Sequence, residues 1–476
     1  MPDPFASPDE SAAALARVAT EAAEYLGSLA RAPVRSGSSD EAAEAFGGSL
    51  PDEGIGTLAT LEELLRDGAE AHVRSAGPRF FHWVIGGATP AALAADWVAS
   101  LFDQNGGGWD ASPLTSRLEL VSLGWLLDLF RLPSDWGGVL TTGATMANFT
   151  GLAAGRQWWG EQRGVDVSRV GLGELPPVPI LSGGFIHVSA RKALAMLGVG
   201  RDRVTDCSDA DGRLEPYKLE AALKALGGQP AIVVANAGEV NAGHFDPIPE
   251  VAELAKTHGA WLHIDGAFGL FARLSPQTAE LAAGIERADS VIADGHKWLN
   301  VPHDCGFAFV REPAYLAGPF AAGAPYLPEA KDERPVYGFM GPELSRRARS
   351  LAVWATLRAY GRDGYRAIVE RCLDHAAHLA RLVEEAEDFE LLLPAPLNIV
   401  FLRYRPRGAP EAELDELNLR MGAELLKDGR VYVGTTQWRG VVGFRPAFVN
   451  WRTTTADVEL LLETLRELGA RQLARA

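Results

Sequence analysis

Short apolar runs alternate with amphipathic segments across the middle of the chain. Between about residues 77 and 310, strand-like runs such as "GGVLTTG", "PAIVVANAG" and "DSVIADG" each lead into a polar turn. Helical patterns such as "TMANFTGLAAGRQWW" and "PEVAELAKTHG" separate several of these runs. Alternation of this kind predicts βαβ units and a mainly parallel sheet covered by helices. We therefore expect a large α/β domain.

The two ends of the chain have different patterns. The first part contains helical stretches broken by "RAPVRSGSSD" and "GGSLPDEGIG", where Gly, Ser and Pro interrupt the periodicity. After residue 345 a long helical pattern leads into a smaller α+β region. These changes predict an N-terminal helical segment over residues 1–76, a large α/β domain over 77–385 and a small α+β domain over 386–476.

Composition and charge narrow the functional classes. The 476 residues are 47% hydrophobic and 22% charged, as in a globular protein large enough to bury a core. A formal charge of −17 gives no electrostatic footprint for nucleic acid or anionic lipid. The three cysteines lack the spacing of a disulfide framework or a zinc site, so we expect no metal.

The same features indicate where the protein resides. No apolar run approaches the roughly 20 residues needed to span a bilayer. The start of the chain lacks the basic region of a signal peptide and has apolar positions at helical spacing. We therefore expect a cytoplasmic protein that has neither nucleic acid nor a membrane as a partner.

Ligands of open α/β sheets bind at the carboxyl ends of the strands, so the turns after the predicted strands are the first places to search for a site. In "TTGATMAN" the small residues Ala144 and Thr145 open a helix, whose amides would form an anion site. The alternative is an ordinary turn capped by a threonine. In "HVSARKALAMLG", His187 precedes a helix that Ser189 would cap, and a purely structural role is the alternative for this histidine.

Two further turns carry a carboxylate and an amine. Asp265 ends the apolar strand of "WLHIDGAFG" and needs a cationic or hydrogen-bonding partner, because an unpaired buried charge is costly. Lys297 lies in "DGHKW", between two apolar runs, where desolvation would leave a neutral, nucleophilic amine. The alternative for Lys297 taken alone is an ordinary surface lysine whose stem packs on apolar residues. Anion site, imidazole, carboxylate and amine together would bind the phosphate, ring face, ring nitrogen and aldehyde of pyridoxal phosphate.

These motifs also carry a family resemblance. "HIDGAFG" followed by "DSVIADGHKWLNVPHDCG", and preceded by "TTGATMAN", "HVSARKALAMLG" and "AGEVNAGHFDPI", resembles the group II pyridoxal-phosphate-dependent decarboxylases, relatives of aromatic-L-amino-acid, glutamate and histidine decarboxylases. The resemblance implies an aspartate-aminotransferase-like fold (fold type I) and decarboxylation of an L-amino acid to its amine and carbon dioxide. It also implies a homodimer with shared active sites, in which the N-terminal segments wrap around the partner.

The resemblance assigns roles to individual residues. Lys297 would bind the cofactor aldehyde covalently, Asp265 would pair with the protonated ring nitrogen, and His187 would stack on the ring and help to protonate the product. The other cofactor contacts would come from residues near the phosphate and the second ring face: Ala144, Thr145, Asp294, His296 and Ala267.

A loop tyrosine protonates the product in the aromatic decarboxylases that the sequence resembles. The segment "YLPEAKDERPVYGFMGPELSRRARS" is the expected equivalent of that loop, and counting back from Arg346 and Arg347 selects Tyr337 as the acid. The alternative is an aromatic side chain that anchors a surface loop. Relatives without this tyrosine tend toward aldehyde-forming oxidative chemistry, so Tyr337 bears on the choice of reaction.

The substrate pocket is predicted from two segments that resemble the family's N-terminal substrate segments, "GPRFFHWVIGGATP" and "DQNGGGWDASPLTSRLE". The residues expected to line or support the pocket are Phe81, Trp83, Trp109 and Pro113. Aromatic enrichment favours an aromatic or large apolar substrate. The glycines of "NGGG" stand where aromatic decarboxylases have bulkier residues, which indicates a wider pocket or one open to a polar substrate.

Two positions leave alternatives open. Glu239 in "AGEVNAG" stands where threonine is commoner, and would either recognise a substrate amine or cap a turn. Arg445 in "GFRPAFVN" is expected to be structural, although a clamp on a substrate carboxylate would suit an aminotransferase. The leading hypothesis is a decarboxylase, with an aminotransferase or an oxygen-using aldehyde synthase as the alternative. A catalytically silent binding protein conflicts with an intact set of Asp265, His187 and Lys297.

Overall fold

A computed structural model describes residues 10–321 and 334–475, which form two compact units. One unit comprises residues 86–376 and 395–399, and the other comprises residues up to 85 together with 377–394 and 400–476. The N-terminal and C-terminal segments thus belong to one unit. The division into three domains at residues 76 and 385 stays a prediction.

The first unit is built on a seven-stranded sheet with the order β1-β7-β6-β5-β4-β2-β3. Its strands are β1 (Gly137–Thr141), β2 (Ile180–Ser182), β3 (Val204–Asp206), β4 (Ile232–Asn236), β5 (Trp261–Asp265), β6 (Ser290–Asp294) and β7 (Gly306–Val310). Strands β2 to β6 pair in parallel, which confirms the predicted α/β fold class.

The seventh strand departs from the parallel pattern. β7 runs antiparallel to both β6 and β1, and β1 is an edge strand. The eleven residues 295–305 join β6 to β7, slightly fewer than the dozen or more that a crossover between parallel strands needs. The connection that carries Lys297 is therefore consistent with the antiparallel direction of β7.

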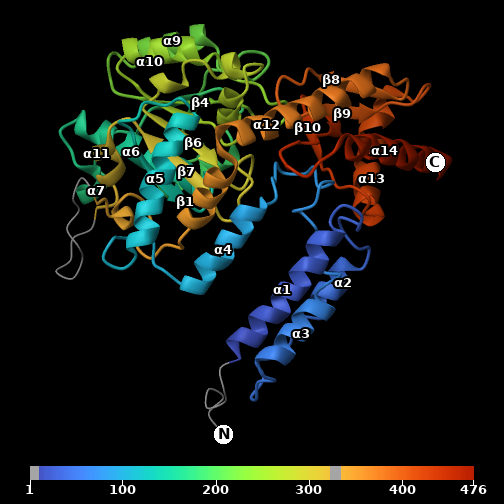
Figure 1. The fold of residues 1–476 in the computed structure, drawn as a ribbon. Helices are drawn as coiled ribbons and strands as arrows, with labels where there is room; N and C mark the ends of the chain where they lie inside the picture. The colour runs from blue at the N-terminus through green and yellow to red at the C-terminus, as the bar shows by residue number, and fades with distance from the viewer. Residues whose placement is uncertain (1–9, 322–333, 476) are drawn as a thin grey trace. The chain divides into compact units, whose positions relative to one another are not determined.

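Helices surround this sheet (Figure 1). They are α4 (Pro90–Phe102), α5 (Pro113–Leu129), α6 (Ala144–Glu161), α7 (Val167–Val170), α8 (Val188–Met196), α9 (Pro216–Ala225), α10 (Ile248–Thr257), α11 (Pro313–Ala317) and the first part of α12 (Ser350–Glu385). Short 3-10 helices occur at Gly269–Leu274, Ala279–Ala282, Ile285–Arg287 and Tyr337–Phe339. α6 packs against β5, β6 and β7, so its N-terminus comes to the ends of the central strands.

The second unit contains an antiparallel sheet with the order β10-β11-β9-β8. Its elements are α1 (Ser11–Ser28), α2 (Ser39–Glu44), α3 (Thr57–Asp67), β8 (Phe389–Leu393), β9 (Phe401–Tyr404), α13 (Glu411–Asp428), β10 (Thr435–Trp438), β11 (Val441–Phe444) and α14 (Thr455–Arg475). This α+β arrangement was expected at the C-terminus. Among the described residues, none of the helices combines the length and apolarity needed to cross a membrane.

Candidate active site

Lys297 follows β6 in the turn that leads to β7. Its Nζ lies 3.1 Å from Oδ2 of Asp294, the last residue of β6, and its side chain is only 15% exposed. Nε2 of His296 lies 3.6 Å from the same oxygen. Burial lowers the pKa of His296, so this imidazole is an uncharged neighbour at neutral pH. The turn therefore holds an amine, a carboxylate and an imidazole together at the carboxyl end of the sheet.

Close packing of the main chain fixes this turn. The amide of Gly86 donates to the carbonyl of His296 at 3.1 Å, and a Cβ at Gly86 would collide with the Lys297 main chain. A Cβ at Gly295 would lie 2.7 Å from Sγ of the buried Cys305. Trp298 is fully buried, so it anchors the turn while Lys297 stays at the surface of the core.

The N-terminus of α6 meets the same carboxylate. The amide of Ala144 donates to Oδ1 of Asp294 at 2.6 Å, and the N-cap residue is Gly143 with φ of 131°. The alternative in which a threonine caps this helix is wrong, because the acceptor comes from β6. A Cβ at Gly143 would lie 3.2 Å from Cε1 of His296, so glycine provides both the backbone conformation and the space.

Asp265 ends β5 and is buried. Its Oδ2 accepts a hydrogen bond of 2.9 Å from Nδ2 of Asn148, and its Oδ1 accepts one of 3.1 Å from the amide of Ala267. The partner expected from the sequence is thus a pair of N–H donors. Asn148, which the sequence analysis missed, lies in α6 and is fully buried. In the sequence, Asn148 is indicated only by being an amide side chain among the small residues of a helix that is expected to be buried.

His187 is the N-cap of α8. Its Nδ1 accepts from the amide of Ser189 at 3.2 Å and lies 2.6 Å from the Ser189 hydroxyl. The expectation that Ser189 caps the helix is therefore wrong. An acceptor Nδ1 leaves the ring proton on Nε2, an assignment made from the hydrogen-bond pattern. Nδ2 of Asn148 also donates to the Ser189 hydroxyl at 3.1 Å, so one amide group connects the surroundings of His187 and Asp265.

Tyr337 lies in a different set of contacts. Its side chain is 1% exposed, and the guanidinium of Arg346 lies 5.7 Å from its ring centroid. Burial and the charge of Glu119 raise its pKa far above the usual value. The interactions described for Tyr337 are thus with Arg346 and Glu119. Its role as an acid stays a prediction. Residues 326–333 of the expected loop lie outside the described part of the chain.

The segment after Tyr337 is fixed to the edge strand β1 by a buried ion pair. Nη2 of Arg346 lies 2.8 Å from Oε1 of Glu119, and it also donates to the carbonyl of Leu140 at 2.6 Å. The amide of Leu140 donates to Oε1 of Glu119 at 3.0 Å. Both main-chain groups of Leu140 are thereby satisfied at an edge where β1 has no further strand beside it.

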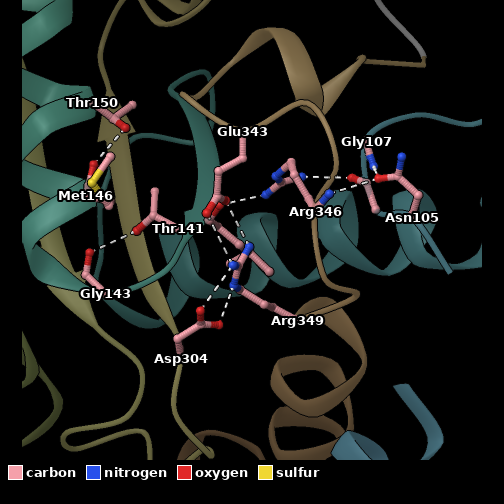
Figure 2. A network of polar contacts seen from close by, with 12 residues as sticks. Asn105, Gly107, Thr141, Gly143, Met146, Thr150, Asp304, Glu343, Arg346 and Arg349 are labelled. Carbon is pink, nitrogen blue, oxygen red and sulfur yellow. Dashed lines mark hydrogen bonds and ion pairs between the residues drawn. The ribbon is translucent and has the colours of Figure 1, made fainter. Parts of the chain in front are cut away.

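The same segment packs against the "NGGG" stretch (Figure 2). Oδ1 of Asn105 accepts from the amides of Arg346 at 2.9 Å and Gly107 at 3.0 Å. A Cβ at Gly107 would lie 2.5 Å from the carbonyl oxygen of Leu344. Gly107 therefore has a packing role that was not predicted from the sequence.

The predicted substrate residues are divided between the two units. In one unit, Phe81 is buried against Phe448, with ring centroids 5.3 Å apart, and Trp83 is 65% exposed. In the other, Trp109 is partly buried, with the guanidinium of Arg334 5.6 Å from its ring centroid. The fourth residue, Pro113, is exposed at the first position of α5. Their role in a substrate pocket stays a prediction.

The two positions left open are both buried. The carboxylate of Glu239 accepts from the amides of Asn241, at 2.7 Å, and Ala242, as expected for a turn cap. Arg445 is 6% exposed, and its amide donates to the carbonyl of Gly434 at 3.2 Å. Burial, together with the charge of Arg445, lowers the pKa of His82 to about 4. Arg445 thus has a structural setting in its own unit.

Comparison with known proteins gives consistent results. The model of the pyridoxal-dependent decarboxylase conserved domain matches residues 58–405. An aromatic-L-amino-acid decarboxylase from Bacillus atrophaeus is 29% identical, covering 88% of this chain and 87% of the relative. An L-2,4-diaminobutyrate decarboxylase from Rhizobium meliloti is 33% identical, covering 89% and 84%. The crystal structure of Oryza sativa TDC with PLP and tryptamine has 25% identity and a TM-score of 0.90, covering 98% and 99% of the two chains.

Proposed function

Because the chain belongs to the pyridoxal-dependent decarboxylase family, we propose that it decarboxylates an aromatic or large apolar L-amino acid at a site formed by Lys297, Asp265 and His187. The family assignment makes the protein a pyridoxal-phosphate-dependent amino-acid decarboxylase. The choice of substrate and the roles of individual residues are the parts we propose.

The arrangement of polar groups fits the cofactor. The amine of Lys297 is available for a covalent bond to an aldehyde. The helix N-terminus at Ala144 and Thr145 would lie beside a phosphate, where the amide of Ala144 already donates to Asp294 and the amide of Thr145 would donate to the phosphate. His296 would lie beside that phosphate, with Nδ1 donating to the carbonyl of Cys305 at 3.0 Å, and Asp294 would hold the amine and the helix end in register. Ala267, whose amide donates to Asp265, would leave room for the second ring face because its side chain is small. When bound, pyridoxal phosphate supplies an electron-withdrawing ring that takes up the electron pair released with carbon dioxide.

Asp265 would orient the cofactor ring, and His187 would help to protonate the product. Asp265, held by two N–H donors, presents a carboxylate that favours a protonated ring nitrogen. His187 keeps its ring proton on Nε2, because Nδ1 is an acceptor, and it would help to protonate the product from the form of the ring that carries a second proton. In the overall reaction the bond from the α-carbon to the carboxylate breaks, carbon dioxide leaves, and a proton takes its place.

The setting of Glu239 supports an apolar substrate. Recognition of a second amine, as in 2,4-diaminobutyrate, calls for a carboxylate directed to the substrate. Both oxygens of Glu239 accept main-chain amides of its own turn, so its position serves the turn. This observation favours the activity named for the Bacillus atrophaeus relative over that named for the Rhizobium meliloti relative.

Product analysis tests the proposal. The cofactor-loaded enzyme is incubated separately with L-tryptophan, L-tyrosine, L-phenylalanine, L-glutamate and L-2,4-diaminobutyrate, and amine, carbon dioxide, aldehyde, keto acid and hydrogen peroxide are measured. We expect amine and carbon dioxide in equal amounts from an aromatic amino acid. The variant Glu239→Gln should keep kcat/KM for that substrate within about threefold of the unmodified enzyme, because an apolar substrate does not use the lost charge and the amide oxygen still accepts one of the two turn amides. Turnover of diaminobutyrate alone would overturn the proposed substrate class.

The buried position of Tyr337 favours one alternative reaction, the oxygen-using aldehyde synthase. That reaction consumes molecular oxygen and water and releases aldehyde, carbon dioxide, ammonia and hydrogen peroxide. If Tyr337 protonates the product, Tyr337→Phe should lower amine formation at least about a hundredfold and raise the share of aldehyde. If the unmodified enzyme already forms aldehyde and peroxide, it is an aldehyde synthase, and the proposed amine-forming reaction is wrong.

We also propose a homodimer in the cytoplasm. α1 and α3 bury none of their residues within their own unit, and several large apolar side chains of the N-terminal segment are exposed, namely Leu15, Phe46, Leu50, Ile55, Leu58 and Leu64. A second chain would cover such a surface. The three cysteines are unpaired and buried, which suits a reducing compartment. Light scattering on the purified protein should give twice the mass of one chain, and a monomer would contradict the dimer.

A further inference from the structure

We propose that a buried chain of hydrogen bonds, running from Trp261 through Ser290 and His263 to Asn148, positions Asp265 and His187 for the cofactor. Asn148, His263 and Ser290 are then positioning residues, since they act through Asp265 and His187. This inference rests on the roles proposed above for Asp265 and His187.

Asn148 is the branch point of this chain of hydrogen bonds. Its Nδ2 donates to Oδ2 of Asp265 at 2.9 Å and to the hydroxyl of Ser189 at 3.1 Å. The Ser189 hydroxyl in turn donates to Nδ1 of His187 at 2.6 Å. The carboxylate of Asp265 accepts only, so the amide of Asn148 must present its nitrogen to this side and its oxygen to the other.

His263 continues the chain on the other side of Asn148. Its Nε2 lies 2.8 Å from Oδ1 of Asn148, and its Nδ1 lies 2.8 Å from the hydroxyl of Ser290. Because Oδ1 of Asn148 is an acceptor, Nε2 carries the ring proton and Nδ1 accepts from Ser290. Burial lowers the pKa of His263 to about 4, against the opposing influence of Asp265, so the ring is neutral under working conditions.

Trp261 is the last member of this chain of hydrogen bonds. Its indole nitrogen donates to the hydroxyl of Ser290 at 2.9 Å. An indole N–H donates only, and a carboxylate accepts only, so both ends impose the same direction on every bond between Trp261 and Asp265. Ser290, His263 and Asn148 are each fully buried, so no water competes for these bonds.

Two glycines of α6 make room for the chain. A Cβ at Gly151 would lie 2.8 Å from Cε1 of His263, and a Cβ at Gly155 would lie 3.0 Å from Cδ1 of Trp261. Glycine inside a helix is unfavourable relative to alanine, so its use at both positions that face these rings indicates close packing of α6 on β5. The rings of β5 are thereby held at a fixed distance from Asn148 on α6.

A pair of substitutions at Asn148 separates positioning from packing. Asn148→Asp keeps the volume but replaces both N–H donors with a second carboxylate facing Asp265, whereas Asn148→Ala removes volume and donors together. The readouts are the Kd of the apoenzyme for pyridoxal phosphate and the visible absorption of the bound cofactor. We expect Kd to rise about tenfold for Asn148→Ala and at least about a hundredfold for Asn148→Asp, with an altered visible band in both. A packing role alone predicts the reverse order, with the isosteric variant close to the unmodified enzyme.

The pH dependence adds a second discriminating readout. The groups that face position 148 are the carboxylate of Asp265, the imidazole of His263 and the hydroxyl of Ser189. Protonation of the introduced carboxyl restores one donor, so Kd for Asn148→Asp, relative to the unmodified enzyme at the same pH, should improve as the pH falls. The relative Kd for Asn148→Ala should stay constant. An unchanged ratio for Asn148→Asp would contradict the positioning role.

Matched serine variants test the distant part of the chain. Ser290→Ala removes the link between Trp261 and His263, and Ser182→Ala removes a buried serine hydroxyl of the same sheet that donates to the Val234 carbonyl at 2.8 Å. We expect a rise of about threefold in Kd for Ser290→Ala and none for Ser182→Ala. Equal effects of the two variants on Kd would contradict a role of the hydrogen-bonded chain in cofactor binding.

Asp265→Asn separates failure of this inference from failure of the proposed site. If Asp265→Asn leaves both Kd and the visible band unchanged, the proposed role of Asp265 is wrong. If Asp265→Asn changes them while the Asn148 and Ser290 variants do not, the site stands and the positioning chain is overturned. Far-UV circular dichroism identifies any variant that fails to fold.

Discussion

Nζ of Lys297 lies 3.1 Å from Oδ2 of Asp294, while Oδ1 of the same carboxylate accepts the first amide of α6 from Ala144 at 2.6 Å. One side chain at the end of β6 thus connects the amine to the helix terminus. Since β6 is a central strand of the sheet, both groups are fixed to the most rigid part of the unit. The geometry therefore brings the group that would bind an aldehyde next to the one that would bind a phosphate.

Removal of the Lys297 amine should abolish covalent cofactor binding. For Lys297→Ala we expect loss of the visible band of the bound cofactor and a fall in kcat of at least about a thousandfold, because no other group at this turn offers an amine. Absorption spectra and product assays provide the measurements. Lys192→Ala, at an exposed position of α8, is the control and should match the unmodified enzyme. Retention of the band in Lys297→Ala would exclude this lysine.

Gly143→Ala should weaken the anion site at the start of α6. The residue has φ of 131°, and the new Cβ would lie 3.2 Å from Cε1 of His296, so both backbone and space oppose the change. We expect Kd for pyridoxal phosphate to rise about tenfold or more, by titration of the apoenzyme. Gly164→Ala is the control, because Gly164 has φ of 73° with nothing near its Cβ position. Similar Kd values for the two variants would argue against a role of this turn in cofactor binding.

The buried ion pair of Arg346 and Glu119 should matter for stability. Arg346→Met leaves the carboxylate of Glu119 buried without its partner, which costs about 3–5 kcal/mol of the free energy of unfolding. The exposed pair of Arg366 and Glu370 provides the control, and Arg366→Met should cost less than about 0.5 kcal/mol. Urea unfolding of both variants measures the difference. Equal losses of unfolding free energy in the two variants would show that burial of the Arg346–Glu119 pair does not determine its contribution to stability.

His263 should make stability depend on pH. Its pKa is lowered from 6.5 to about 4 because the charged ring is disfavoured by burial. Between these two values the unfolded chain binds a proton that the folded protein does not, so the free energy of unfolding falls as the pH falls, by about 1.4 kcal/mol for each pH unit. Above pH 6.5 the ring is neutral in both states and contributes no pH dependence.

Comparison of variants isolates this contribution from the carboxylates that also titrate in acid. Unfolding by urea at pH 8, 6 and 5 should show a shallower loss of stability for His263→Gln than for the unmodified protein. His72→Gln, at an exposed histidine, should keep the original slope. The account of His263 fails if its variant also keeps that slope.

Local patterns in the sequence predicted the strands and the groups at their ends. Asp265 and Lys297 were found because each follows an apolar run short enough to be a buried strand, and parallel strands bring their carboxyl ends together. The direction of β7 was not predicted, because an apolar run carries no record of strand direction. The capping of α8 by His187 depends on a side-chain rotamer, which the sequence does not specify.

The interactions between distant residues were beyond sequence reasoning. Asn148 and Asp265 are 117 positions apart, and Arg346 and Glu119 are 227 apart. Periodicity identifies Asn148 as a buried helix position but gives no information on which strand residue it faces. Its partners become evident only when α6 lies on β5, a contact that depends on Gly151 and Gly155 of the helix.

The most direct test of the central claim, that Lys297 forms the cofactor site, is peptide mapping after borohydride reduction. Borohydride makes the covalent link between the cofactor and its lysine permanent, and mass spectrometry of the digested protein then identifies the modified peptide. We predict that the cofactor mass will be found on Lys297, in the peptide containing "DGHKW". Modification of a different lysine, with Lys297 unmodified, would contradict the account.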